Sequence, residues 1–102
     1  MKISKAFETF QKEAPQVSEA WQQFVMSHGK TSALDEKTQA LAYLSVLSAV
    51  RLESGIPFHV KMAKMHGATR EEVISAALVG LPAVGNIVTA SLPVAIEAFD
   101  EE

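Results

Sequence analysis

The sequence predicts an all-α protein, a bundle of five to six helices in a single domain that spans residues 1–102. Three observations lead to this prediction. Apolar residues recur at helical spacing along most of the chain, and capping residues or glycines lie between the helical segments. No stretch alternates apolar and polar residues as a half-buried strand does. Third, a length of 102 residues fits one domain.

The N-terminal part of the chain predicts either two amphipathic helices or one kinked helix. Apolar residues follow helical spacing over residues 3–14 and again over residues 17–28. Pro15 lies between these stretches, where a proline can either begin a helix or kink one. We expect Gly29 to end the second stretch and Trp21 to be its packing anchor.

A long central helix is predicted for residues 35–53. Ser32 and Asp35 form a pattern similar to a capping box at its start. A helix that is apolar almost all round is typically buried at the centre of a domain. The apolar residues of this stretch are Leu41, Ala42, Leu44, Val46, Leu47, Ala49, Val50 and Leu52.

Two further helices follow a Ser-Gly-Ile-Pro break. Proline suits the first turn of a helix, so we expect a helix over residues 57–66 that ends at Gly67 and packs antiparallel to the long central helix. Thr69 and Glu72 then form a near capping box at the start of a helix over residues 70–79.

The C-terminal third raises the question of a membrane span, because residues 73–96 contain no charged side chain. Glycine, proline and asparagine residues divide this stretch into short pieces, and no basic flank marks a cytoplasmic side. We therefore expect no membrane association, and two buried helices, the second ending near Phe99.

Composition limits the classes of function. The nine Lys and Arg residues form no cluster and the net charge is −3, so we expect no nucleic-acid partner. The absence of cysteine excludes disulfides and thiolate catalysis. Glu8 interrupts any apolar run of a signal peptide, so we expect a cytoplasmic protein. A hydrophobic fraction of 48% exceeds what a small domain buries easily, which favours contact with other chains.

The three histidines occupy two kinds of position. His28 and His66 each precede a glycine at a predicted helix end, where a histidine can bond the free carbonyl groups. His59 lies about three residues into a predicted helix, where the helix dipole lowers the imidazole pKa and favours the neutral form. A neutral imidazole can accept a proton or polarise a carbonyl group, so His59 is the candidate acid/base.

Glu53 and Ser54 precede the His59 helix and are the candidate catalytic partners of the imidazole. The alternatives are a solvated Glu53, a Ser54 that only caps the helix, and an inert core His59. His59 and His66 lie two helical turns apart, about 10 Å, and cannot share one metal ion. We therefore expect no metal and no other cofactor.

Three segments together resemble a known protein family. They read LDEKTQAL at residues 34–41, FHVKMAKMHGATREEV at residues 58–73 and AVGNIV at residues 83–88. This pattern is similar to the carboxymuconolactone decarboxylase superfamily, which includes the alkyl hydroperoxidase D branch, and it covers roughly residues 30–99. The resemblance implies the AhpD-like (alkylhydroperoxidase-like) helical fold and ring-shaped homo-oligomers, trimers or hexamers, with the site close to a subunit interface.

The resemblance also shows what this chain lacks. The peroxidase branch uses a Cys-x-x-Cys pair ahead of its histidine, and the matching positions hold Leu52 and Gly55. A proton-transferring glutamate of that branch is matched by Ala40. A thiolate must attack the peroxide and a second thiol must resolve the product, which neither Leu nor Gly can do. We therefore predict that the chain has no thiol peroxidase activity.

The decarboxylase branch lacks the cysteine pair as well and keeps the histidine. It implies proton transfer on a small organic acid or lactone, with His59 as the acid/base. Lys61 and Lys64 are the nearest cations in sequence for a substrate carboxylate, unless both simply face solvent. The alternative is a catalytically inactive, oligomeric family member that acts as a small-molecule binder or accessory protein. Tyr43, Met62 and Met65 are expected in the core or at an interface.

Overall fold

The computed structural model describes residues 3–101, and every regular element in that part of the chain is helical. Six α-helices of eight or more residues are present there, which confirms the predicted all-α class. The elements in chain order are α1 (Lys5–Glu13), α2 (Pro15–Lys30), α3 (Glu36–Ala49), the 3-10 helix η1 (Glu53–Gly55), α4 (Ile56–Met65), α5 (Arg70–Ala77), the single turn α6 (Leu81–Val84), the 3-10 helix η2 (Asn86–Ser91) and α7 (Leu92–Asp100).

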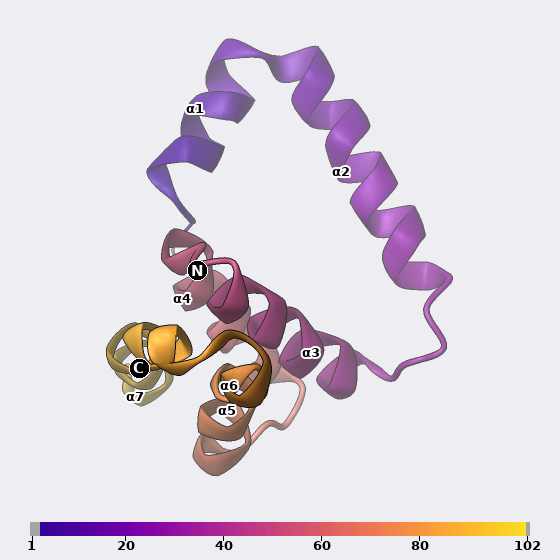
Figure 1. The fold of residues 1–102 in the computed structure, drawn as a ribbon. Helices are drawn as coiled ribbons and strands as arrows, with labels where there is room; N and C mark the ends of the chain where they lie inside the picture. Colours follow the sequence, from indigo (N-terminus) through magenta and orange to yellow (C-terminus); the bar gives the residue numbers. More distant parts are fainter. Residues whose placement is uncertain (1–2, 102) are drawn as a thin grey trace.

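The helices form two parts (Figure 1). Helices α3 to α7 are packed together and are called the body here; α3 lies against α4 and α5, and α7 lies against α4 and α5. Helices α1 and α2 are called the arm, and they pack mainly on each other. In Figure 1, α2 stands away from the body and is joined to α3 by a short connection.

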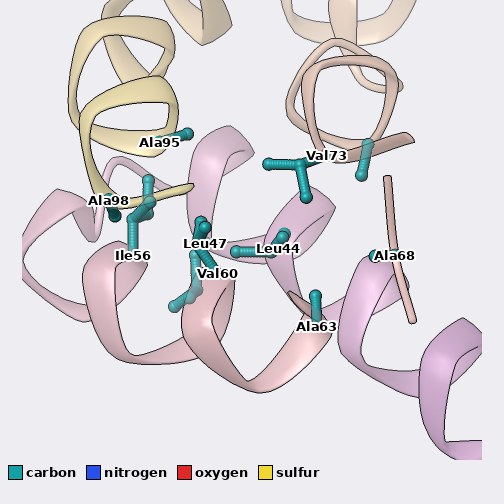
Figure 2. Packing of buried hydrophobic residues seen from close by; sticks show 10 residues of the cluster. Leu44, Leu47, Ile56, Val60, Ala63, Ala68, Val73, Ala95 and Ala98 are labelled. Atoms are coloured by element: carbon teal, nitrogen blue, oxygen red, sulfur yellow. The ribbon is translucent and has the colours of Figure 1, made fainter. Parts of the chain in front are cut away.

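The core lies between α3, α4, α5 and α7 (Figure 2). Alanine supplies half of the buried apolar residues described, and this small side chain lets helices approach closely. The fully enclosed larger side chains are few, with Ile56, Val60 and Val73 at most 1% exposed. Members of the cluster are Leu44, Leu47, Ile56, Val60, Ala63, Ala68, Val73, Ala76, Ala95 and Ala98.

The N-terminal stretch forms two helices, which settles the alternative that the sequence left open. Ala14 leaves the helical region with φ −135° and ψ 62°, and Pro15 opens α2 at its first turn. The predicted end at Gly29 is wrong, because α2 continues through Lys30 and its last carbonyls accept the backbone N–H of Thr31. A glycine that keeps helical dihedrals does not end a helix.

Helix α3 is shorter than the sequence predicts. It begins one residue later, at Glu36, and ends before residue 53. Asp35 is the N-cap, and its carboxylate accepts the backbone N–H of Thr38 at 2.8 Å. The helix stops at Ala49 rather than at residue 53. Arg51 adopts φ +64°, and the backbone N–H of Leu52 donates to the carbonyl of Leu47 at 2.9 Å, which closes a Schellman motif.

Two serines of the largely apolar helix α3 form hydrogen bonds to the C-terminal end of α5. Ser45 Oγ donates to the carbonyl of Ala76 at 2.8 Å, and the buried Ser48 Oγ donates to the carbonyl of Ala77 at 2.9 Å. Both carbonyls belong to the last turn of α5, where helix carbonyls run short of intrahelical donors; that of Ala76 also accepts the backbone N–H of Val79 at 3.3 Å. These bonds fix α5 against α3, a role that the sequence did not reveal.

Both predicted helix boundaries around residues 66–72 are confirmed. Gly67 has φ +92°, a left-handed conformation that few side chains tolerate, and it follows the end of α4. Thr69 and Glu72 form a reciprocal capping box, with Thr69 Oγ1 accepting the N–H of Glu72 at 3.1 Å and Glu72 Oε1 accepting the N–H of Thr69 at 2.9 Å.

The C-terminal third is more broken than the two predicted helices. Helix α5 ends at Ala77, and α6 and η2 precede the final helix α7. Gly85 has φ +86° between α6 and η2, and Pro93 lies in the first turn of α7. None of the helices within residues 3–101 combines the length and hydropathy needed to cross a bilayer.

Candidate functional site

His59 lies in the first turns of α4, directly after the 3-10 turn η1. Gly55 is the residue before α4, and Pro57 occupies the first turn, where its missing N–H leaves no donor unpaired. Ile56 and Val60 of the same helix are buried in the core at 1% and 0% exposure. This packing fixes α4, so that the His59 imidazole lies at the edge of the core and is half-buried.

Aromatic rings surround the His59 imidazole. Tyr43 of α3 stacks on it, with ring centroids 4.2 Å apart and an angle of 24° between the planes. Phe58 meets it edge-on, with centroids 5.1 Å apart. Tyr43 itself is 44% exposed, so part of the stack is open to solvent.

Burial lowers the pKa of His59 below its ordinary value, because loss of solvent disfavours the imidazolium form. The direction is the one expected from sequence, although the cause here is desolvation rather than the helix dipole. Burial therefore favours the neutral imidazole. Within residues 3–101 no protein group hydrogen-bonds to this ring, so its nitrogen atoms are free for a ligand or for water.

Glu53 and Ser54 do not hydrogen-bond to His59 in the part of the chain that the structure describes. Glu53 Oε2 instead accepts the Arg51 Nε–H at 2.7 Å, across the left-handed turn that ends α3. Ser54 lies within η1 and is exposed. The three residues are close in sequence, but the turn sends the Glu53 carboxylate towards Arg51.

Lys61 and Lys64 are engaged at the end of α7. Lys61 Nζ donates to the backbone carbonyl of Glu101 at 2.9 Å, and Lys64 Nζ donates to that of Phe99 at 2.7 Å. Lys64 Nζ also lies 4.6 Å from the centroid of the Phe99 ring. Lysines at the carbonyl end of a helix satisfy its free acceptors and complement its dipole. Both cations are thus held at a helix end.

The other two histidines differ from the expected carbonyl caps. His66 is the C-cap residue of α4, but its Nδ1 lies 2.9 Å from Oε2 of Glu36 in the first turn of α3. The His28 ring lies beside Phe24, with centroids 6.0 Å apart. An acid and an aromatic ring, rather than helix carbonyls, are the side-chain partners of these two residues.

The positions that hold cysteines in the peroxidase branch flank η1. Leu52 is 55% exposed, and Gly55 lies against the Leu47 side chain, 3.6 Å from where a Cβ would stand. Ala40 is partly buried against the core. None of these three side chains can take or give a proton.

Tyr43 is the site residue that sequence reasoning assigned to another role. It was expected in the core or at an interface, and it forms the stacking face of the His59 ring. The two residues are on different helices, and no spacing rule links them before the packing of α3 on α4 is known. Helical periodicity could only place Tyr43 on a face of α3.

Two concave surfaces lie away from His59. An open depression is lined by Asp35, Glu36, Lys37, Thr38 and His66 at the start of α3. A small cavity of about 100 Å³ lies between α4 and α7. Neither is lined by His59. Across residues 3–101, no three His, Asp or Glu side chains converge as a metal site requires.

Comparisons with known proteins give a consistent result. A family model described as the carboxymuconolactone decarboxylase family matches residues 15–97. The apo crystal structure of a carboxymuconolactone decarboxylase family protein from Legionella pneumophila is similar, with a TM-score of 0.79 and 26% sequence identity. That similarity covers 93% of this chain and 85% of the other. Comparison with curated proteins gives no match.

Proposed function

Because the chain belongs to the carboxymuconolactone decarboxylase family, we propose that it carries out acid/base chemistry on a small organic acid or lactone through His59. The proposal includes a cytoplasmic location and a homo-oligomer, a trimer or hexamer. It excludes thiol peroxidase activity of this chain, because the sequence contains no cysteine.

The observation that carries the proposal is the state of His59. Its imidazole is half-buried, its pKa is lowered by burial, and it stacks on Tyr43 without a protein hydrogen bond among the described residues. A neutral imidazole held in one orientation can accept a proton and return it. Loss of CO2 from a lactone acid leaves an electron pair on carbon that must take up a proton. Isomerisation removes one proton and delivers another, and one imidazole can do both.

Tyr43 has a positioning role in this proposal. The stacked phenol ring keeps the imidazole plane fixed and removes water from one face, which keeps the imidazole neutral. A flat, unsaturated ring such as a lactone could lie against the open side of the same aromatic surface. Glu53 and Ser54 remain candidate partners only if binding of a ligand frees Glu53 from Arg51.

A second candidate function is that of a catalytically inactive binder or accessory protein. The arrangement of charges supports it, because Glu53 pairs with Arg51 and the two lysines of α4 bind helix carbonyls. Catalysis on an anionic substrate needs a cation for the carboxylate, and these groups are already paired. A binder of uncharged or weakly polar ligands needs no such cation.

Thermal-shift measurements distinguish these functions. Wild type, His59→Gln and His66→Gln are screened against lactones, dicarboxylates and other small acids. A ligand at 100 times its Kd raises the free energy of unfolding by about 2.7 kcal/mol. We expect one class to stabilise wild type and His66→Gln but not His59→Gln, and to be turned over. Stabilisation without turnover of that class favours the binder, and equal stabilisation of all three proteins contradicts a site at His59.

A further inference from the structure

Helices α3 and α4 meet at the Tyr43–His59 stack along lengths that carry no charge. Residues 38–50 contain no Asp, Glu, Lys or Arg, and the same holds for residues 54–60. Tyr43 is 44% exposed, and Val46, about one helical turn further along α3, is 59% exposed. The surface beside the imidazole is therefore apolar and partly open to solvent.

The five lysines and arginines of residues 31–101 already have partners. Lys61 and Lys64 donate to backbone carbonyl groups at the end of α7. The other three cations form ion pairs at 2.7 to 2.9 Å, in the pairs Lys37–Glu72, Arg51–Glu53 and Arg70–Asp100. Neither ring of the stack takes part in these contacts. A carboxylate bound at the stack thus finds none of these five cations unpaired.

Arg51 lies just before the turn η1 that leads into α4, so its diversion to a ligand must be considered. Its ion pair with Glu53 is exposed, and exposed pairs contribute little to stability. A ligand carboxylate that took over Arg51 would, however, lie beside the carboxylate of Glu53, and repulsion between the two opposes the gain. Exchange of one acid for another at Arg51 therefore gives little affinity.

The charge balance of this part of the chain opposes anions as well. Residues 31–102 contain nine Asp and Glu against five Lys and Arg, a formal charge of −4. A surface with an excess of one sign of charge lowers the local concentration of ligands of the same sign. An anionic substrate is thus repelled before it reaches the stack.

The polar groups that the stack does offer suit an uncharged partner. Burial favours the neutral imidazole of His59, which has one N–H donor and one acceptor nitrogen. The phenol of Tyr43 adds a hydroxyl group that can donate or accept. These groups can satisfy a carbonyl oxygen, whereas a carboxylate that loses water here without a charge partner is strongly disfavoured.

We infer that the His59 site selects an uncharged, unsaturated ring with a carbonyl group, such as a lactone without a carboxylate, and discriminates against acids of the same shape. A flat ring packs on the exposed part of Tyr43, in the offset geometry that aromatic surfaces favour. Its carbonyl oxygen needs a hydrogen-bond donor and not a cation. The inference rests on the proposed function and narrows its two substrate classes, organic acid and lactone, to the lactone.

The chemistry narrows in the same way, because a lactone without a carboxylate has no CO2 to lose. The remaining reaction is migration of a double bond within the ring. The imidazole nitrogen takes a proton from the carbon beside the carbonyl, and the electron pair of that C–H bond moves into the conjugated system. The same nitrogen then returns the proton to the carbon at the far end of that system. Reactant and product are isomers, so no co-reactant is consumed.

Nuclear magnetic resonance of Tyr43 tests the selection, because this is the only tyrosine of the chain and its ring signals need no assignment by mutation. The probes are the free acid and the methyl ester of one unsaturated five-membered lactone, which differ in charge and little in shape. Each is titrated into wild type at pH 7, where the acid is ionised. We expect the ester to shift the Tyr43 signals and to bind at least about tenfold more tightly than the acid.

An added cation gives the converse test. Val46→Lys places an ammonium group about one turn from Tyr43, and Val79→Lys places the same group after α5, at a residue that is 65% exposed. We expect Val46→Lys to bind the acid several-fold more tightly than wild type does, and Val79→Lys to behave as wild type. Circular dichroism and melting temperatures check that both variants fold.

Binding of the acid to wild type as tightly as the ester overturns the inference, and so does the absence of any Tyr43 shift with the ester. Failure of the proposed chemistry gives a different result, in which the ester binds in preference to the acid but takes up no deuterium from D2O. If the acid is the better ligand and exchanges its protons, the chemistry stands and the selection is refuted.

Discussion

His59 lies between Tyr43 and Phe58, and its surroundings are aromatic rather than charged. The sequence singled out this histidine because it lies near the start of a predicted helix and because the branch of the family that lacks the cysteine pair keeps a histidine there. It could not assign Tyr43, since that contact depends on how α3 packs on α4. It also placed Glu53 beside His59, whereas the left-handed turn at Arg51 gives that carboxylate another partner.

The first prediction concerns pH. Burial lowers the native pKa of His59, so between the native and unfolded pKa values the unfolded chain binds more protons. The free energy of unfolding should therefore fall as pH drops below about 6.5, the ordinary histidine value. Thermal unfolding from pH 7.5 to 5.5, a range above the titration of the carboxylates, should show a smaller loss for His59→Gln than for wild type. An identical pH dependence would show that burial does not perturb His59.

The second prediction concerns the stack itself. Tyr43→Ala opens one face of the imidazole to water, so the His59 pKa should rise towards its ordinary value. Val50→Ala removes apolar surface from the same face of α3 and should leave that pKa where it is in wild type. Proton NMR titration of the imidazole resonances measures both. A rise of equal size in the two variants would mean that Tyr43 does not shield the ring.

At the scale of elements, helix ends decided which sequence predictions held. The Thr69–Glu72 capping box and the Gly67 end are confirmed because side-chain chemistry there is specific. The predicted end of α3 was wrong because Arg51 adopts the left-handed conformation, which at helix ends is usually found at glycine. The predicted end of α2 at Gly29 was also wrong, because this glycine stays helical and α2 continues past it. Residue type alone cannot distinguish these cases.

The third prediction addresses the end of α3. A left-handed conformation costs a non-glycine residue about 1–2 kcal/mol. Arg51→Gly should therefore leave the free energy of unfolding unchanged or raise it by up to about 1 kcal/mol, despite loss of the exposed ion pair to Glu53. Arg51→Val should lower it, because a β-branched side chain tolerates this conformation poorly. Urea unfolding gives both values, and an Arg51→Gly variant less stable than Arg51→Val would refute the strained turn.

At the scale of the whole molecule, the all-α class followed from periodicity, and the family match and the similar solved structure support it. Periodicity did not predict the division of the helices into a body and an arm. The apolar face of α2 suits a neighbour within the chain as well as one in another chain, and periodicity does not tell them apart. Packing does, because α2 meets only α1 to any extent within residues 3–101. Stability should then depend on association.

The fourth prediction is that the melting temperature of the wild type rises with protein concentration. Association that binds the folded chain and not the unfolded one adds to stability by mass action. Differential scanning calorimetry over a hundredfold range of concentration should show the rise in wild type and in Met26→Glu, a control on the opposite face of α2. Phe24→Glu, which places a charge on the apolar face of that helix, should melt at one temperature throughout. A wild-type melting temperature that is independent of concentration would contradict assembly through the arm.

The proposed role of His59 is to transfer protons to and from a small organic acid or lactone. The most direct measurement is deuterium incorporation from D2O into a ligand that the thermal-shift screen identifies, followed by NMR. Exchange at carbon reports proton transfer even where net turnover is slow. We expect incorporation with wild type and with His66→Gln, and none above background with His59→Gln. A bound ligand that exchanges no proton, or one that exchanges equally with His59→Gln, would contradict it.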